Sequence, residues 1–282
     1  MEVIVAESSG FCYGVKRALD TVAKSAKTSC RRMFTLGPLI HNPQVIQKLE
    51  VEGIESVADL SEVPAGSLVV MPTHGAPARV MAQAQKLGLE IVDVTCPFVR
   101  KVHRLAESLV RQGYQVVILG DEGHTEVQGI ISRAGNDAVA VSCAEDLKKS
   151  PLKRRVGILA QTTQSLERYQ QLVAAACECA YEVRAYNTIC SATVQRQKAA
   201  VAVAQGVDVM LVVGGRNSAN TRRLAEICAE TGVSTYHVEV ADEIDADWFA
   251  RAKKAGLTAG ASTPDWIIKE VIRKVKEIPA AV

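Results

Sequence analysis

Three cysteines recur at similar intervals along this chain of 282 residues. Cys12, Cys96 and Cys190 are separated by 84 and 94 residues, and each ends an extended run and directly precedes a segment with helical spacing. A cysteine at the start of a helix lies near unpaired backbone N–H groups and the positive end of the helix dipole, which favour its thiolate form. These three cysteines are therefore candidate metal ligands.

The number of cysteines in this set indicates which metal group they suit. A structural zinc site normally has four ligands and often uses local Cys-x-x-Cys pairs, which are absent from this sequence. Three thiolates could instead hold three irons of a 4Fe-4S cluster, leaving the fourth iron open to a substrate as a Lewis acid and electron donor. The remaining cysteines are expected to be small buried hydrophobic side chains: Cys30, Cys143, Cys177, Cys179 and Cys228.

Three histidines lie in turns between a predicted strand and a predicted helix. They are His41, His74 and His124. Hydrogen-bond donors beside helix N-termini bind phosphate groups without the charge of a lysine cluster, so a phosphate or diphosphate is the expected ligand. Glu126 lies two residues after His124, and both side chains can face one pocket. Glu126 is therefore the candidate proton donor.

Polar residues in the C-terminal third of the chain lie in similar turns. Ser218, Asn220 and Ser262 could donate hydrogen bonds to the same anion, but Ser and Asn are also common helix caps, and the residues alone leave both interpretations open. Gly214 and Gly215 follow a predicted strand without the full G-x-G-x-x-G spacing, so they are weak evidence for a nucleotide loop.

The elements that must position these residues alternate between short apolar β-rich runs and amphipathic helical segments. This alternation predicts an α/β fold with small, mostly parallel sheets. The periodic cysteines and echoing segments between them predict three similar units of roughly 80 to 95 residues. Because ligands bind at the carboxyl ends of parallel strands, the turn residues are expected to surround a common centre.

Composition excludes several classes of function. Lys plus Arg number 33 and Asp plus Glu 31, so a net charge of +2 gives no strong reason to expect a nucleic-acid partner. The apolar stretches are much shorter than the ~20 residues of a membrane span. Residues 1–10 lack the charged and hydrophobic parts of a secretory signal, so a cytoplasmic location with reduced thiols is expected.

The motifs, taken together and in this order, resemble those of the LytB/IspH family over nearly the whole chain. The matching segments are Gly10–Val15, His41–Pro43, Thr73–Gly75, Asp93–Pro97, Gly123–Val127, Gln161–Thr163, Asn187–Thr193 with Arg196 and Gln197, and Asn217–Thr221.

The resemblance implies a fold, a cofactor and a reaction. The fold is a trefoil of three α/β domains, 14–96, 97–190 and 191–270, with residues 1–13 bringing a strand and Cys12 to the centre and 271–282 forming a helix end and tail. The cofactor is a 4Fe-4S cluster held by Cys12, Cys96 and Cys190. The reaction is the reductive dehydroxylation of 4-hydroxy-3-methylbut-2-enyl diphosphate to isopentenyl and dimethylallyl diphosphate, the last step of the non-mevalonate isoprenoid pathway.

The resemblance also implies roles for individual residues and a partner. Glu126 supplies protons, Thr162 orients the hydroxyl and the proton path, and Thr193 lines the site. The diphosphate is bound by His41, His74, His124, Ser218, Asn220 and Ser262. A ferredoxin or flavodoxin delivers electrons. Three residues depart from the family pattern, namely Pro72, Thr125 and Ala219.

Two other classes of function use the same residues. A hydro-lyase would use the open iron without net electron transfer, and an iron-sulfur electron carrier or sensor would need no proton donor. Dependence on a reductant separates the reductase from the lyase, and loss of turnover in Glu126→Gln separates it from the carrier.

Overall fold

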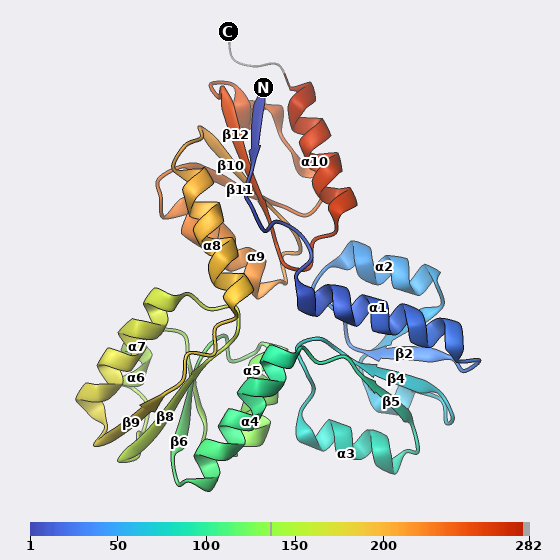
Figure 1. The fold of residues 1–282 in the computed structure, drawn as a ribbon, viewed down its shortest axis with the longest axis vertical. Coiled ribbons are helices and arrows are strands. Elements are labelled where there is room, and N and C mark those ends of the chain that lie inside the picture. Colours follow the sequence, from blue (N-terminus) through green and yellow to red (C-terminus); the bar gives the residue numbers. More distant parts are fainter. Residues whose placement is uncertain (136, 279–282) are drawn as a thin grey trace. The chain divides into compact units, whose positions relative to one another are not determined.

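The computed structural model describes residues 1–135 and 137–278 and has the predicted α/β fold (Figure 1). Within these residues, three parallel sheets contain four strands each. The strands are β1 (Glu2–Val5), β2 (Met33–Leu36), β3 (Ile54–Val57), β4 (Leu68–Met71), β5 (Glu90–Asp93), β6 (Gln115–Leu119), β7 (Val139–Val141), β8 (Arg155–Ala160), β9 (Glu182–Ala185), β10 (Val209–Val213), β11 (Ser234–Val238) and β12 (Lys254–Ala259).

Helices connect the strands as parallel pairing requires. The α-helices are α1 (Tyr13–Thr28), α2 (Pro43–Val51), α3 (Ala78–Lys86), α4 (Pro97–Arg111), α5 (Thr125–Ala134), α6 (Ala144–Leu147), α7 (Leu166–Cys179), α8 (Ser191–Ala204), α9 (Ala219–Ala229) and α10 (Asp265–Glu277). Short 3-10 helices occupy Leu60–Glu62, Ala241–Glu243 and Ala246–Phe249. None of the described helices combines the length and apolar character that a membrane span requires.

The three sheets share one strand order. Their orders are β5-β4-β2-β3, β9-β8-β6-β7 and β1-β12-β10-β11. In each sheet, the edge strand that comes first in these orders leads to one of the periodic cysteines: β5 to Cys96, β9 to Cys190 and β1 to Cys12. A shared order of this kind is what an internal repeat produces.

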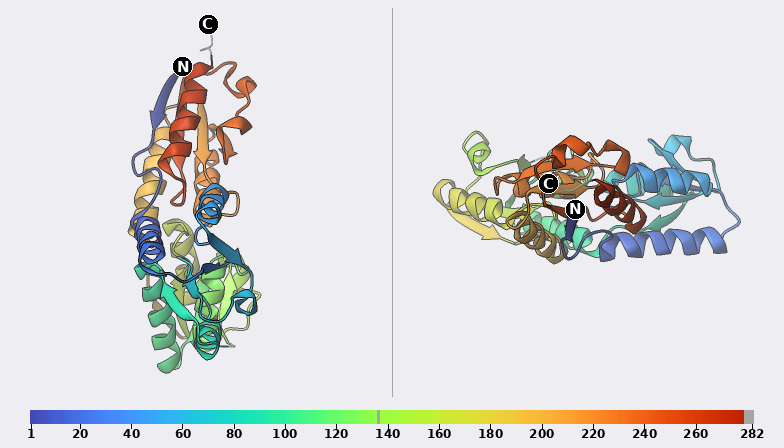
Figure 2. Two further views of the ribbon diagram at one scale, coloured as in Figure 1. Left: turned by 90° about the vertical axis from the view of Figure 1, so that its right-hand side faces the viewer. Right: turned by 90° about the horizontal axis from the view of Figure 1, so that it is seen from above.

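The strand expected within residues 1–13 joins its sheet from the opposite end of the chain. It is β1, which pairs in parallel with β12 and places Val3 opposite Ala255. The two figures show β1 beside α10, with which it is in contact (Figures 1 and 2). This sheet therefore needs both ends of the chain.

Contacts divide the chain into two compact units. The first unit contains residues 1–16, 41–47 and 191–282, and the second contains 17–40 and 48–190. The first unit holds the sheet of β1 and β10–β12, and the second holds the other two sheets. Residues 279–282 of the predicted C-terminal tail lie outside the described residues.

Both faces of the first unit's sheet are covered. Leu211 and Val213 of β10 pack in a core with α10, whereas Met210 and Val212 pack in a core with α8 and α9. Alternate residues of a strand point to opposite faces, so one strand contributes to both cores. This explains why β10 is a continuous apolar run without an alternating polar face.

In the second unit, the segment after Cys96 forms the predicted amphipathic helix. It is α4, whose Val102, Ala106 and Leu109 are buried in a core shared with α5. The core also contains Ile118 of the fully buried strand β6. Packing of α4 and α5 on this sheet fixes the turn between β6 and α5, which carries His124, and the first turn of α5, which carries Glu126.

Candidate functional site

The three periodic cysteines occupy the same position in their sheets. Each follows the edge strand and donates its backbone N–H to a carbonyl oxygen in the turn after the neighbouring strand. The bonds run from Cys12 to Ala261 (3.1 Å), from Cys96 to Thr73 (2.9 Å) and from Cys190 to Thr162 (3.0 Å). Each sheet therefore presents its cysteine with the same backbone support.

Each of these cysteines also stands at the start of a helix. The helices α1, α4 and α8 begin one residue after Cys12, Cys96 and Cys190. Pro97 fits the first position of α4 because no intrahelical N–H bond is made there. None of the three cysteines is in a disulfide, and all three are partly exposed. Their number, exposure and position at helix N-termini fit a group that needs three thiolates.

The described residues contain no single cluster of three or more His, Cys, Asp or Glu side chains that could hold a metal ion. Cys12 belongs to the first unit, whereas Cys96 and Cys190 belong to the second.

The prediction that the other five cysteines are buried is correct only for Cys228. Burial raises the pKa of its thiol to about 12. Cys30, Cys177 and Cys179 are exposed, and Cys143 is partly exposed. Cys177 and Cys179 lie off the face of α7 that packs on its sheet, which explains their exposure. The prediction used only the tendency of cysteine to be buried. Whether Cys177 and Cys179 are buried depends on the face of the helix on which they lie.

The second unit brings together four of the predicted site residues. The rings of His74 and His124 meet edge to face, with centroids 6.3 Å apart. Glu126 lies in the first turn of α5, directly after the turn that carries His124. Thr162 follows β8 and contacts the Glu126 carboxylate. Three separate segments therefore converge at the carboxyl ends of the strands, as the sequence predicts for this unit.

His124 caps α5 through its ring. Its Nδ1 accepts a hydrogen bond of 3.1 Å from the backbone N–H of Glu126. A neutral imidazole that accepts at one nitrogen carries its proton on the other. The cap therefore places the proton of the ring on Nε2, and it holds Glu126 in the first turn of the helix.

Glu126 has a carboxyl group that titrates near neutral pH. The residue is 3% exposed, and burial raises the pKa of its carboxyl to about 7 against the opposing effect of two hydrogen bonds from Thr162. The backbone N–H of Thr162 donates to Oε1 at 2.7 Å, and its hydroxyl donates to Oε2 at 2.9 Å. A carboxyl group that exchanges its proton near pH 7 is suited to acid–base catalysis.

The first unit contains the remaining predicted ligands of an anion. Ser262 donates its hydroxyl to the backbone oxygen of His41 at 3.0 Å, which joins two turns that are 221 residues apart in sequence. Burial, followed by the charge of Arg222, lowers the pKa of His41, so its ring is neutral at pH 7. Thr193 is buried in the first turn of α8.

The sequence left open whether Ser218, Asn220 and Ser262 are helix caps, and the structure gives a different answer for each of them. Ser218 is the cap of α9, accepting the N–H of Thr221 at 3.3 Å. Ser262 is not the cap of α10, because Pro264 occupies that position. Asn220 is 5% exposed, and its Nδ2 has no hydrogen-bond partner within the described part of the chain. A buried donor without a partner at a helix N-terminus favours an anion as its partner.

Gly214 and Gly215 have a packing role that replaces the nucleotide-loop interpretation. A Cβ atom at Gly215 would lie 2.6 Å from the backbone oxygen of His41, and one at Gly214 would lie 2.5 Å from Oγ1 of Thr263. Gly215 lets the turn after β10 approach the His41 turn closely, and Gly214 lets it approach Thr263. Ser218 and His41 are brought into the same unit partly by this close approach.

Two polar residues of the family motifs hold turns of the site in place, although neither of them was assigned a role from the sequence. Gln161 accepts the backbone N–H of Asp121 at its Oε1 (3.0 Å), linking the turns after β8 and β6. Asn42 is buried and caps α2 by accepting the N–H of Val45 at 3.0 Å. A buried polar residue at a strand-to-helix turn is the signal that could have identified both.

Arg17 holds the backbone before Cys96, but its residue type and position in the sequence do not indicate this role. Its guanidinium donates to the backbone oxygens of Val94 (3.0 Å) and Thr95 (2.8 Å), the two residues before the cysteine. A single arginine on an amphipathic helix ordinarily indicates a solvated face, so nothing in the sequence distinguished it.

A sequence model of the LytB protein family matches residues 3–276. The chain belongs to the LytB family. It is 47% identical to the 4-hydroxy-3-methylbut-2-enyl diphosphate reductase of Pelobacter propionicus over 278 residues, which cover 99% of both chains. It is 45% identical to the enzyme of the same name from Geobacter sulfurreducens, with 98% of each chain covered.

Solved structures of LytB relatives have the same fold. One is described as (E)-4-hydroxy-3-methyl-but-2-enyl diphosphate reductase, the terminal enzyme of the non-mevalonate pathway; it is 41% identical, with a TM-score of 0.70 and 99% of this chain and 100% of that chain covered. Another, the E-1-hydroxy-2-methyl-but-2-enyl-4-diphosphate reductase from Plasmodium falciparum, is 26% identical, with a TM-score of 0.93 and 99% and 89% covered.

The three departures from the LytB pattern leave the local backbone intact. The carbonyl of Pro72 accepts the N–H of Gly75 at 3.0 Å, which closes the turn that carries His74. Thr125 begins α5 and is exposed, and Ala219 begins α9 directly after its serine cap.

Proposed function

We propose that this chain catalyses the reductive dehydroxylation of 4-hydroxy-3-methylbut-2-enyl diphosphate to isopentenyl and dimethylallyl diphosphate, the last step of the non-mevalonate pathway. Membership of the LytB family and similarity to reductases of that name over 98–99% of the chain support the reaction. The balanced reaction consumes two electrons and two protons for each substrate and releases the hydroxyl as water.

In this proposal, Cys12, Cys96 and Cys190 hold a 4Fe-4S cluster through three thiolates. When bound, the cluster supplies electrons and an open iron that acts as a Lewis acid for the substrate hydroxyl. The equivalent backbone bonds of the three cysteines favour this ligand set. The three sheets would belong to domains of residues 14–96, 97–190 and 191–270.

Glu126 is the proposed proton donor, and its geometry is the observation that carries the assignment. The carboxyl is buried, titrates near pH 7 and is bonded to Thr162 at both oxygens. When Glu126 is protonated, its O–H can donate to the Thr162 hydroxyl, which can in turn pass its own proton outward. Thr162 would then orient the substrate hydroxyl and carry the proton towards it.

Six residues are the proposed diphosphate ligands: His41, His74, His124, Ser218, Asn220 and Ser262. The buried Asn220 Nδ2, which has no hydrogen-bond partner among the described residues, supports the assignment. The cap of α5 places the proton of the His124 ring on Nε2, so that the ring is a hydrogen-bond donor at this atom. Neutral donors suit the net charge of +2. Thr193 would line the site.

The remaining parts of the proposal concern the cell. A ferredoxin or flavodoxin would deliver the electrons, and the reaction would take place in the cytoplasm. No nucleic acid or membrane takes part.

The deciding experiment is an anaerobic assay of the reconstituted protein with the allylic diphosphate and a chemical reductant. Glu126→Gln should reduce kcat by about two to four orders of magnitude, because it removes a positioned acid, while iron and sulfide content stay unchanged. Glu122→Gln is the matched control, since Glu122 is an exposed acid in the turn directly before α5.

Each alternative function predicts a different result. Turnover without any electron source would indicate a hydro-lyase. Unchanged activity of Glu126→Gln would contradict the assigned role and favour an electron carrier or sensor. A colourless protein without iron after anaerobic reconstitution would contradict the cofactor.

A further inference from the structure

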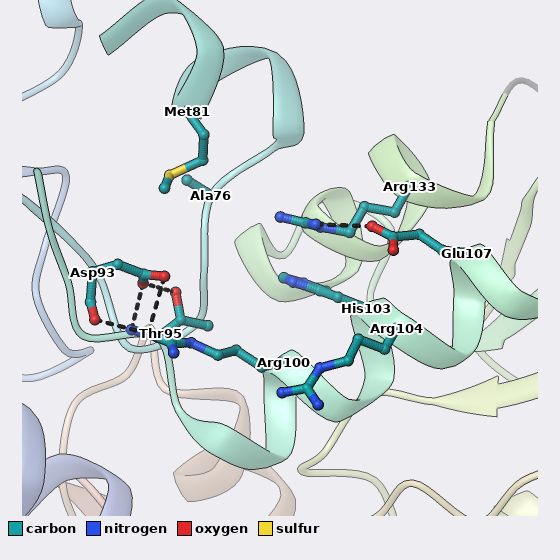
Figure 3. Close-up of a pocket in the computed structure, with 9 residues that line it drawn as sticks. All are labelled: Ala76, Met81, Asp93, Thr95, Arg100, His103, Arg104, Glu107 and Arg133. Atoms are coloured by element: carbon teal, nitrogen blue, oxygen red, sulfur yellow. Dashed lines mark hydrogen bonds and ion pairs between the residues drawn. The ribbon is translucent and has the colours of Figure 1, made fainter. Parts of the chain in front are cut away.

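The second unit contains a cavity of about 230 Å³ that none of the proposed substrate or cluster residues line. We propose that this cavity binds a small phosphate-bearing anion. It lies between α4, α5, α3 and the end of β5, and its charged and titratable lining consists of Asp93, Arg100, His103, Arg104, Glu107 and Arg133 (Figure 3). The inference concerns binding at this cavity and does not rest on the proposed function.

Three arginines line the cavity, and only two of them form ion pairs with its carboxylates. Arg100 pairs with Asp93, and Arg133 pairs with Glu107, each at 3.0 Å. Arg104 is exposed and forms no ion pair or hydrogen bond with the part of the chain that the structure describes. Figure 3 shows the side chains of Arg133 and His103 side by side, with the Arg104 guanidinium below them. The cavity therefore offers a free guanidinium beside two paired ones.

Buried donors without partners also line the cavity. The Nε atoms of Arg100 and Arg133 are buried and have no hydrogen-bond partner among the described residues. The Nε2 atom of His103 is also buried without a partner, but it packs against Gly129. Buried polar groups in proteins are nearly always bonded, so the two guanidinium Nε atoms indicate a missing acceptor. A phosphate has several acceptor oxygens, and guanidinium groups match its geometry.

The size of the cavity selects among possible anions. Its volume is several times the ~30 Å³ that one water molecule occupies in the liquid, so a phosphate group fits with a small organic substituent. A nucleic-acid backbone would need an extended basic surface instead of a single pocket of this size. A phosphate or phosphomonoester is therefore the expected class of ligand.

The imidazole of His103 connects the cavity to the turn and the helix that carry the proposed active-site residues. A Cβ atom at Gly75 would lie 2.8 Å from its Cε1, and one at Gly129 would lie 3.0 Å from its Nε2. Gly75 follows His74, and Gly129 lies in α5, one turn after Glu126. Burial, followed by the charge of Arg133, lowers the pKa of His103 to about 4, so the ring is neutral at pH 7.

The test measures binding of inorganic phosphate to the full-length protein by isothermal titration calorimetry. Arg104→Ala should weaken binding at this cavity at least about tenfold, because one charge-assisted hydrogen bond is lost. Its fold should be unaffected, since Arg104 forms no contact of this kind within the described chain. Arg111→Ala is the matched control: it removes an exposed arginine of the same helix outside the cavity and should bind phosphate like the wild type.

A further variant separates this cavity from the proposed diphosphate site. Ser218→Ala alters that site and should keep the phosphate binding that Arg104→Ala removes. Loss in Ser218→Ala together with unchanged binding in Arg104→Ala would overturn the inference. Equal weakening in Arg104→Ala and Arg111→Ala, or no binding to the wild type at millimolar phosphate, would also overturn it.

Discussion

Burial and hydrogen bonding have opposite effects on the pKa of the Glu126 carboxyl group. Burial disfavours its charged form, whereas the two hydrogen bonds from Thr162 favour it, and burial has the larger effect on the pKa. The result is a pKa of about 7 in the folded protein against 4.5 for the ordinary group. The native state therefore binds more protons than the unfolded state between these two values, and its stability falls as the pH rises through them.

Glu126→Gln should remove this pH dependence. The amide resembles the protonated carboxyl, since it can accept from the Thr162 N–H and donate to the Thr162 hydroxyl. Between pH 4 and pH 8, we expect the free energy of unfolding of the variant to rise relative to wild type, by on the order of 3 kcal/mol. Chemical denaturation of both proteins at these two pH values measures the difference. A difference that is the same at both pH values would show that Glu126 does not titrate in this range.

At the residue scale, the sequence identified the groups that could do chemistry but not the groups that hold them. Cys, His and Glu at strand-to-helix turns are recognisable because their types and positions are unusual together. Arg17 supports the backbone before Cys96, and His103 fits against two glycines, through contacts between segments far apart in sequence. Contacts of this kind depend on tertiary packing, so a single sequence without coordinates does not predict them.

At the element scale, the turns are positioned by close approach of backbone to backbone. The turn after β10 and the turn that carries His41 meet where Gly215 has no side chain, and the same His41 carbonyl accepts the hydroxyl of Ser262. The strands and helices were predictable from periodicity, because apolar runs and amphipathic segments alternate regularly. The approach of the two turns was not, because glycine in a sequence indicates only that a close contact or unusual backbone is allowed.

Gly215→Ala should therefore weaken substrate binding. The added methyl group would meet the His41 carbonyl oxygen at 2.6 Å and push the two turns apart. We expect KM for the allylic diphosphate to rise about tenfold or more, because a displaced turn costs roughly one charge-assisted hydrogen bond, while kcat changes little. Gly206→Ala is the control, since the nearest atom to a Cβ there is 3.8 Å away. A lower kcat with unchanged KM would place the effect of Gly215 in the chemical step instead.

At the scale of the whole molecule, the chain uses its first strand to complete a sheet formed by its last strands. The sequence predicted three similar units and a strand before Cys12, and the shared order of the three sheets agrees with that repeat. The pairing of β1 with β12 can be inferred from the repeat only when the strand order of the other two sheets is known. The two strands are about 250 residues apart in the sequence. Non-local pairing of this kind has no local signal.

The pairing of β1 predicts opposite outcomes for proline at neighbouring positions. The N–H of Ala6 donates to Leu257 of β12 at 2.7 Å, and the N–H of Glu2 donates to Lys253, the residue before β12, at 3.3 Å. Such bonds alternate along a strand in parallel pairing. The N–H of Val5 therefore points towards the open edge. Ala6→Pro should lower the free energy of unfolding by about 2 kcal/mol, because it leaves the Leu257 carbonyl without its partner, whereas Val5→Pro should cost clearly less.

Thermal unfolding measures this difference, as a fall in Tm of roughly 4–8 °C for Ala6→Pro. Iron content after anaerobic reconstitution should fall in the same variant, since β1 leads directly to Cys12 and its backbone bond to Ala261. Val5→Pro should retain iron like the wild type. Equal losses of stability and iron in both variants would mean that the strand is sensitive to any rigid residue, and that its hydrogen bonds to β12 are not what holds the first cysteine in place.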